Sequence, residues 1–356
     1  MKKLFNEFKR LFCLLIIIGQ LTLLVGCPNS VKEIKPQGMM YFSFFDTVST
    51  IYSYAGDDAE DFKKNCDEVS AILEEYHKLF DIYNEYSGIN NLCTLNKNAG
   101  GEPLVVDEKL IEFLLYTKEM YILTNGKSNV MLGPVLKLWH DARELASVDP
   151  SKAYIPDSEL LEDAAKHSTF ESLEINEENN TIRISDPKAS IDVGAIGKGY
   201  ATEKAAQYLE NKNCTSYVLN IGGNIRIIGT KVNGEGWVTG IKNPLNTETY
   251  AFYTNLSNTS CVTSGDYERY FTVNNEKYHH IIDPDTLMPS NYFSSITVIT
   301  KDSGLADTLS TALFCMSYEE GLELVEKLEG VEVLWIYKNG EQVKTDGLLA
   351  IENNNN

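Results

Sequence analysis

Residues 190–209, SIDVGAIGKGYATEKAAQYL, decide how the rest of the chain is interpreted. They begin as a β-like run at 190–193, pass through Gly194, Gly197 and Gly199, and continue as a predicted helix with apolar residues at helical spacing. Small residues between a strand and a helix N-terminus let backbone N–H groups approach an anion, which the helix dipole also favours. This stretch therefore predicts an anion-binding corner.

Two charged residues accompany this corner. Asp192 supplies a carboxylate and Lys198 a cation. The sequence GAIGKG matches neither G-x-G-x-x-G nor a Walker A loop, so it predicts no nucleotide motif by itself. An ordinary strand-to-helix turn explains the glycines equally well until the other motifs are considered.

The pattern of predicted elements favours an α+β fold. The chain has 356 residues, 43% hydrophobic and 23% charged, which suits one large or two modest globular domains. Helices are predicted at 57–80, 107–124, 157–166, 305–316 and 318–328, with a Gly-Pro corner at 129–139 leading into another. Strands are predicted at 39–45, 49–54, 173–175, 181–184, 216–221, 225–229, 236–241, 249–254, 260–263, 268–273, 278–282, 294–300 and 331–337. Because strands and helices do not alternate, a Rossmann domain is not expected.

The N-terminus is typical of a secretory lipoprotein. A basic segment at 1–10 precedes an apolar run at 11–25, and Leu-Val-Gly-Cys at 24–27 resembles a bacterial lipobox. We expect cleavage before Cys27, lipidation of its sulfur, and attachment to the cell membrane on the extracytoplasmic side. A signal peptide with an incidental cysteine, or an uncleaved anchor, remains possible on the same pattern. The expected boundaries are 1–26 for the signal peptide, 27–38 for a tether, 39–351 for the globular domain and 352–356 for a disordered tail.

Charge and cysteine content exclude several classes of protein. The net charge is −20, and loss of residues 1–26, with four basic and one acidic side chain, lowers it to −23. So acidic a surface is unsuited to nucleic acid or anionic lipid, and a phosphate site must be built locally from N–H groups, cations or a metal ion. Five cysteines remain after Cys13 and Cys27, with no C-x-x-C, which argues against a disulfide scaffold and structural zinc.

Asp307 and Thr311 form a candidate metal site. They are four residues apart on a predicted helix, so both side chains face the same side. A carboxylate and a hydroxyl are hard oxygen ligands suited to Mg²⁺ and a bound phosphate. Taken alone, the pair is better explained as an acidic residue near the helix start and a threonine in the helix interior.

Five ordered motifs together resemble the ApbE family of flavin transferases, over about residues 39–335. The motifs are DVGAIGKGY at 192–200, NIGGNI at 220–225, TSGDYERY at 263–270, HIIDP at 280–284 and ADTLSTA at 306–312. The resemblance implies a compact α+β sandwich of mixed and antiparallel sheets with flanking helices, related to T-fold domains. It also implies an FAD:protein FMN transferase, which transfers FMN from FAD to a Thr or Ser hydroxyl of a client protein through a phosphoester and releases AMP.

The resemblance also assigns roles to residues. Asp307 and Thr311 would bind Mg²⁺ through side chains and Ala195 through its carbonyl. His280 and Asp307 are the candidate catalytic residues, and His280 either accepts the hydroxyl proton or only forms a hydrogen bond in the site. The residues expected to contact FAD or line its pocket are Tyr83, Lys127, Ser128, Asn129, Asp192, Lys198, Thr263, Ser264 and Ile282.

The sequence departs from the family pattern at three places. Phe45-Asp46-Thr47 stands where the family has Met-Gly-Thr, Asn129 replaces an Asp, and Leu287 replaces a Gly. The first two bear on contacts to FAD and leave the metal site intact. The aromatic Tyr83 suits a transferase.

Two other functions fit parts of the same pattern. A Mg²⁺-dependent FAD pyrophosphatase would use the same site with water as the acceptor, giving FMN and AMP. A non-catalytic flavin-binding lipoprotein would bind FAD without releasing AMP and would leave Asp307 and Thr311 unused. For a transferase, the expected client is a flavin-accepting subunit of a membrane redox complex or an extracellular electron-transfer protein.

Overall fold

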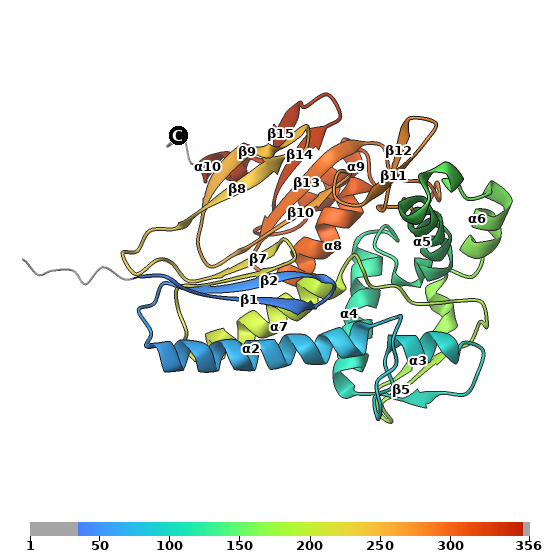
Figure 1. Ribbon diagram of the computed structural model, residues 1–356, viewed down its shortest axis with the longest axis horizontal. Coiled ribbons are helices and arrows are strands. Elements are labelled where there is room, and N and C mark those ends of the chain that lie inside the picture. The colour runs from blue at the N-terminus through green and yellow to red at the C-terminus, as the bar shows by residue number, and fades with distance from the viewer. Residues whose placement is uncertain (1–34, 352–356) are drawn as a thin grey trace, which may run out of the picture. The chain divides into compact units, whose positions relative to one another are not determined.

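Eight antiparallel strands form the main sheet of the computed structural model, which describes residues 35–351 (Figure 1). Every neighbouring pair in this sheet is antiparallel. In spatial order the strands are β1 (Gln37–Phe44), β2 (Thr47–Ser53), β6 (Tyr217–Ile221), β7 (Asn224–Ile228), β10 (Ser260–Gly265), β13 (Phe293–Thr300), β14 (Glu332–Tyr337) and β15 (Gln342–Lys344).

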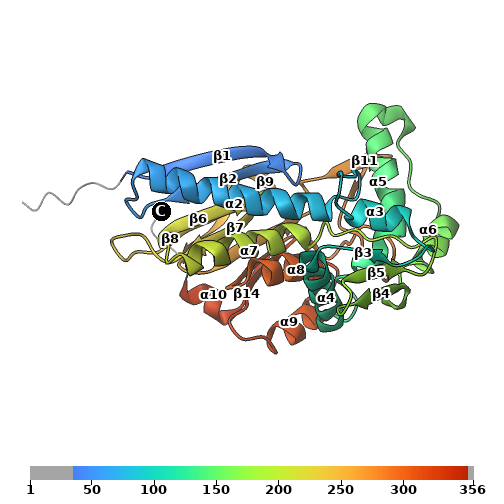
Figure 2. The same ribbon diagram turned by 90° about the horizontal axis from the view of Figure 1, so that it is seen from below.

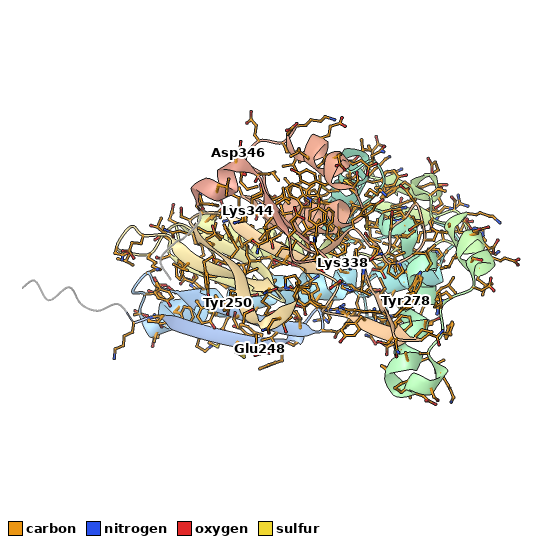
Figure 3. The ribbon with its side chains drawn as sticks, turned by 90° about the horizontal axis from the view of Figure 1, so that it is seen from above. Glu248, Tyr250, Tyr278, Lys338, Lys344 and Asp346 are labelled. Atoms are coloured by element: carbon orange, nitrogen blue, oxygen red, sulfur yellow. The ribbon has the colours of Figure 1, made fainter. Side chains whose placement is uncertain are left out.

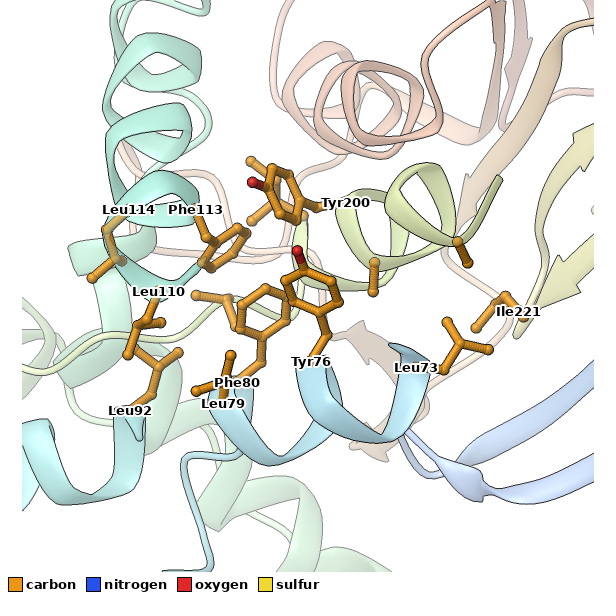
Figure 4. Packing of buried hydrophobic residues seen from close by; sticks show 14 of the residues in the cluster. Leu73, Tyr76, Leu79, Phe80, Leu92, Leu110, Phe113, Leu114, Tyr200 and Ile221 are labelled. Atoms are coloured by element: carbon orange, nitrogen blue, oxygen red, sulfur yellow. The ribbon is translucent and has the colours of Figure 1, made fainter. Parts of the chain in front are cut away.

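Helices cover one face of this sheet. Figure 2 shows α2 (Ala59–Phe80), α7 (Gly197–Asn211) and α8 (Ser303–Phe314) lying across it, with α4 (Glu108–Leu123) beside them. An aromatic cluster joins α2, α4 and α7, as Figure 4 shows: the rings of Phe80, Phe113, Tyr76 and Tyr200 lie against one another. This packing fixes the N-terminal end of α7, where the glycine-rich corner lies.

A hairpin covers part of the opposite face. It consists of β8 (Trp237–Asn243) and β9 (Asn246–Leu256), which pair only with each other among the described strands. Its apolar side chains Trp237 and Phe252 are buried in one cluster with Ile227, Leu334 and Ile336 of the main sheet. The short helix α10 (Asp346–Ala350) contributes Leu348 to the same cluster.

The remaining elements surround one end of the sheet. The three-stranded sheet has the order β3 (Leu104–Val105), β5 (Thr181–Ile184), β4 (Leu173–Asn176), and β11 (Tyr270–Val273) pairs with β12 (Glu276–His279). The other helices are α3 (Leu92–Lys97), α5 (Gly133–Val148), α6 (Ser158–Ala165) and α9 (Tyr318–Val325), with short 3₁₀ turns at Val130–Leu132, Pro150–Lys152 and Phe170–Ser172.

The α+β class and many local signals are confirmed. The Asp58 side chain caps α2 by accepting from the N–H groups of Glu60 and Asp61. Asp107 and Asp157, which stand at the predicted starts of two helices, cap α4 and α6 in the same way. Gly126 follows α4 with a φ of +84°, as expected for a residue just past a helix end. Four observed elements, α3, β3, β15 and α10, were not predicted from the sequence, because they are short and lack clear periodicity.

The predicted strand at 190–193 is wrong. These residues are extended but join no sheet. The Asn96 side chain accepts from the N–H of Ile191 (2.7 Å) and donates to its carbonyl (2.9 Å), and the N–H of Asp192 donates to the carbonyl of Val130. A side-chain amide therefore provides the hydrogen bonds that a neighbouring strand would otherwise supply.

The signal peptide, Cys27 and the tail at 352–356 lie outside the described residues. Strand β1 begins at Gln37 and pairs there with Ser53, so the last two residues of the predicted tether belong to the main sheet. No helix within residues 35–351 is long and apolar enough to cross a membrane.

Candidate active site

One pocket contains every site residue that the sequence predicted. Its volume is about 1260 Å³, above the roughly 1,000 Å³ that limits most small-molecule pockets. The predicted residues that line it are Tyr83, Lys127, Ser128, Asn129, Asp192, Ala195, Lys198, Thr263, Ser264, His280, Ile282, Asp307 and Thr311. The five motifs, which are distant in sequence, therefore converge in space.

The floor of the pocket is the contact between the start of α7 and helix α8. Oδ2 of Asp307 accepts hydrogen bonds from the N–H of Gly199 (2.7 Å) and from the side-chain amide of Asn224 (2.9 Å). Only glycine fits at position 199, because the Cβ of any other residue would lie 2.3 Å from the Cβ of Asp307 and 2.4 Å from the carbonyl oxygen of Ser303. The close approach of two helices thus aligns a buried carboxylate with a helix N-terminus.

The oxygen groups around Asp307 suit a hard cation. Within residues 35–351, no hydrogen bond is made to Oδ1 of Asp307, although its side chain is only 5% exposed. The hydroxyl of Thr311 lies 3.3 Å from that of Ser264, and both residues line the pocket together with Ala195. One free carboxylate oxygen, one hydroxyl and one carbonyl fit a Mg²⁺ ion that takes its other ligands from water and phosphate.

No fuller metal cage exists in the described chain. Among residues 35–351, no group of three or more His, Cys, Asp or Glu side chains lies close enough together to hold a metal ion. An ion at Asp307 would therefore take part of its coordination from water or a bound phosphate.

His280 presents a neutral imidazole to the pocket. Burial lowers the pKa of its side chain to about 3, and the positive charge of Arg269 acts in the same direction. Its Nδ1 lies 3.2 Å from the carbonyl oxygen of Arg269. Because a carbonyl only accepts, Nδ1 carries the hydrogen and Nε2 keeps its lone pair. This tautomer is suited to accepting a proton at Nε2.

The neighbouring His279 has a structural position. It is 5% exposed, its Nε2 donates to the carbonyl of Ser290 (2.7 Å), and its Nδ1 accepts from the N–H of Ile281 (3.2 Å). Burial lowers the pKa of His279 to about 4. Protonation at Nδ1 would direct a hydrogen at the N–H of Ile281, so the neutral ring is part of the fold.

Tyr83 lies on a loop that is organised by one carboxylate. Asp81 accepts from the N–H groups of Tyr83 (2.7 Å) and Asn84 (2.9 Å) and from the hydroxyl of Tyr86 (2.8 Å). Although burial opposes its charge, these hydrogen bonds lower the pKa of Asp81. The Tyr83 side chain remains 60% exposed, and its ring centroid lies 5.7 Å from that of His140. The loop thus holds an aromatic ring at the open side of the pocket.

Asp192 faces cations across the pocket. Its side chain is partly open to the pocket, yet burial by the surrounding atoms raises its pKa. The N–H of Gly194, which donates to Oδ1 (2.9 Å), and the nearby charges of Arg143 and Arg269 oppose that rise. A local positive region therefore exists in a chain of net charge −20.

Three predicted FAD contacts already have protein partners. Lys127 forms ion pairs with Asp283 and Asp285, each at 2.8 Å; burial works against its charge, but these pairs raise its pKa. Asn129 caps the turn at Val130–Leu132 and donates to the carbonyl of Ser168. Ser128 is buried. These residues line the pocket while they also hold its wall in place.

The other predicted residues lie at the pocket surface or beneath it. Nζ of Lys198 lies 3.3 Å from the carbonyl oxygen of Gly194 and has no carboxylate partner among the described residues. Thr263 bonds to Thr297 of the neighbouring strand through their hydroxyls (2.8 Å). Ile282 is buried.

The sequence did not predict that two basic residues of α5, or the hairpin wall, would line the pocket. His140 and Arg143 line the pocket from α5 and lie within 2.9 Å of each other. Residues 239–242 of β8 and Tyr250 of β9 form another part of the wall. No sequence signal identified either group, since their presence in the pocket depends on where α5 and the hairpin pack. Arg269 lay within a quoted motif without an assigned role.

Comparison with known proteins identifies the family. A profile of the ApbE family matches residues 45–335, most of the chain. The chain belongs to the ApbE family. Two solved ApbE structures are similar to this chain. The ApbE protein of Thermotoga maritima has a TM-score of 0.77 and is 26% identical, and the match covers 90% of this chain and 100% of that chain. The flavin transferase ApbE of Vibrio cholerae has a TM-score of 0.72 at 25% identity, covering 89% and 100%.

Two curated relatives of this chain are both named FAD:protein FMN transferase. The FAD:protein FMN transferase of Haemophilus influenzae is 29% identical over 323 residues, covering 90% of this chain and 91% of that protein. The FAD:protein FMN transferase of Treponema pallidum is 30% identical over 294 residues, covering 77% and 79%. Both relatives are named for flavin transfer, and this chain matches them over 91% and 79% of their length.

Proposed function

We propose that this chain transfers FMN from FAD to a Thr or Ser hydroxyl of an acceptor protein, with Mg²⁺, and releases AMP. The observation that carries the proposal is the Asp307 carboxylate. It is buried, aligned by Gly199 and Asn224 through Oδ2, and free at Oδ1 in a pocket that Thr311, Ser264 and Ala195 also line. The names of the curated relatives support the same reaction.

Charge neutralisation is the main requirement of this chemistry. Phosphoryl transfer depends on alignment and on stabilising charge at the phosphate oxygens more than on covalent help. A Mg²⁺ ion bound at Asp307, Thr311 and Ala195 would supply part of that charge. The ammonium of Lys198 and the N-terminal turn of α7 add positive potential from the protein itself.

His280 is suited to take the proton of the attacking hydroxyl. In the reaction, the hydroxyl oxygen bonds to the phosphorus of the FMN half, the bond from that phosphorus to the bridging oxygen breaks, and AMP leaves. The hydroxyl proton passes to Nε2 of His280, whose neutral tautomer is set by the carbonyl of Arg269. A pKa of about 3 makes a weak base, and negative phosphates beside the ring would raise it toward the working range.

Tyr83 and the cations bind the rest of FAD. The exposed ring of Tyr83 offers a flat apolar surface for a flavin at the open side of the pocket. Lys198, Arg143 and Arg269 supply the attraction that an anionic dinucleotide needs in an acidic protein.

The test uses the soluble chain from Pro28 onward with FAD, Mg²⁺ and a Thr-bearing acceptor domain. We expect a fluorescent acceptor band on a denaturing gel, stoichiometric AMP, and loss of both with EDTA or in Asp307→Ala. AMP and free FMN without a labelled acceptor would indicate FAD pyrophosphatase activity. Bound FAD without AMP would contradict both enzymatic functions and favour a flavin-binding lipoprotein.

We also propose that the chain is anchored to the cell membrane, on the extracytoplasmic side, through lipidated Cys27. The acceptor would then be a flavin-accepting subunit of a membrane redox complex or an extracellular electron-transfer protein. The basic, apolar and Leu-Val-Gly-Cys segments of residues 1–27 support this. Mass spectrometry of the mature N-terminus tests it, with Cys27→Ala as the control expected to be released from the membrane.

A further inference from the structure

The pocket extends beyond the residues that have an assigned role. All the predicted site residues come from the loop at Tyr83, the segments at 127–129, 192–198, 263–264 and 280–282, and helix α8. A separate part of the wall comes from Thr239, Gly240, Ile241 and Lys242 of β8, Tyr250 of β9 and Val48 of β2. We refer to this part of the pocket, lined by these six residues, as the hairpin extension.

The hairpin extension runs along a free strand edge. Successive side chains of a strand point to opposite faces, yet four consecutive residues, 239–242, line the pocket. Ile241 illustrates this, since its side chain is buried in the cluster between the hairpin and the main sheet. The pocket therefore contacts β8 along its edge. That edge is unpaired among residues 35–351, because β8 pairs with β9 on its other side only.

The turn between β6 and β7 lines the same pocket as the hairpin extension and leads directly to a residue that contacts Asp307. Asn220 and Gly223 line the pocket at this turn, and the next residue, Asn224, donates to Asp307. Nothing lies within 4 Å of the position that a Cβ on Gly223 would occupy. A backbone entering from β8 could therefore pass close to this turn on its way to Asp307.

The charge and surface of the extension suit a polypeptide. Its six residues include one cation, Lys242, and no carboxylate, in a chain of net charge −20. Tyr250 is 54% exposed and lies against Gly240, where a Cβ would be 2.6 Å from the ring. Figure 3 shows Tyr250 on β9, well separated from Tyr278 on the β11–β12 hairpin. An exposed aromatic beside an open strand edge is typical of sites that bind extended peptides.

From these observations we propose that the free edge of β8 pairs with an extended, hydroxyl-bearing segment of the acceptor protein. Strand pairing fixes the register of the segment and directs one Thr or Ser hydroxyl toward Asp307 and His280. This inference rests on the proposed transferase function and names the surface on which the acceptor binds.

The first test uses alternation along the acceptor backbone. Short synthetic peptides with one central Thr and otherwise random sequence are incubated with the chain, FAD and Mg²⁺, and flavin-labelled peptides are identified by fluorescence and mass spectrometry. The best peptide is then remade with N-methyl groups on every second amide, in both alternating sets. In a paired strand only one set of N–H groups faces the partner. We expect one set to lower transfer at least about tenfold and the other to have little effect.

The outcomes separate this inference from the transferase function. Equal losses with both N-methylated sets, or AMP release with no labelled peptide, would show that strand pairing of an extended segment is wrong while FAD cleavage stands. Failure to release AMP under any condition would instead contradict the enzymatic function.

A second test locates the surface on the enzyme. We expect Tyr250→Ala to raise the KM for the acceptor peptide about tenfold and to leave the KM for FAD little changed. Tyr253→Ala is the matched control, because its ring packs beside Tyr250 (centroids 5.2 Å apart) on the same strand but does not line the pocket. A rise in the KM for FAD, with the peptide KM unchanged, would show that the extension holds FAD and would overturn the proposal.

Discussion

The floor and the wall of the pocket are built in different ways. At the floor, Gly199, Asn224 and Asp307 come from three elements, are buried, and hydrogen bond directly to one another. On the wall, Tyr83 and Tyr250 are 60% and 54% exposed and lie on a loop and a hairpin. Buried contacts that allow only one arrangement suit a reaction that needs the same charges in the same places. Exposed rings suit the binding of larger and more variable molecules.

The largest expected effect tests the floor as a chemical site. Asp307→Asn keeps an oxygen that can accept from Gly199 and Asn224 but removes the charge that a metal ion needs. We expect AMP release to fall about a thousandfold, with only a modest change in stability. Rates at saturating FAD and urea denaturation measure the two effects. An active, fully stable Asp307→Asn would show that the carboxylate only caps α7.

The next largest effect tests the floor as a packing contact. Gly199→Ala would bring a Cβ within 2.3 Å of Asp307, so we expect the free energy of unfolding to fall by about 3 kcal/mol or more. Gly194→Ala in the same stretch is the control, since its Cβ would meet only Asp192 Oδ1 at 3.2 Å. Chemical denaturation of both variants gives the comparison. Equal stabilities would mean that α7 and α8 separate easily and that the floor is not rigid.

A smaller effect concerns pH and the structural histidine beside the site. The pKa of His279 is about 4 in the folded protein against 6.5 for the ordinary side chain, so the unfolded chain binds more protons between these values. Stability from this residue is therefore complete above about pH 6.5 and is lost as the pH falls toward 4. We expect a loss of about 2 kcal/mol between pH 7 and pH 5.

Urea denaturation at the two pH values measures this loss. His279→Gln, which can donate to Ser290 and accept from Ile281 without titrating, should show a shallower dependence. A dependence that is unchanged in His279→Gln would assign it to other groups.

The smallest effect tests the wall. Tyr83→Ala removes the exposed ring and should weaken FAD binding about tenfold, while Tyr83→Phe should change it little. Tyr154→Ala is the control, because Tyr154 is also exposed but lies outside the pocket. Fluorescence titration with FAD gives the dissociation constants. If Tyr83→Ala binds FAD normally, the flavin does not contact this part of the wall.

Many of the residues that line the pocket could be named from the sequence because the motifs that contain them are local. Each of the five motifs is a short, contiguous stretch, and the residue types within it carry the chemistry, as with Asp307 and Thr311 on one helix face. Two helix starts were predictable for the same reason, since Asp107 and Asp157 cap helices through their own neighbours. The error at 190–193 has a non-local cause, because Asn96, distant in sequence, takes the place of a partner strand.

By itself the sequence determined the α+β class, the main helices and strands, and the residues of the floor, since caps, alternation and motifs depend on neighbouring residues. Only the tertiary structure decided which nitrogen of His280 is free, because a carbonyl of another segment, that of Arg269, sets the tautomer. It also decided that α5 brings Arg143 to the pocket and that the β8 edge remains open beside it. These features depend on long-range packing, which no single stretch of residues encodes.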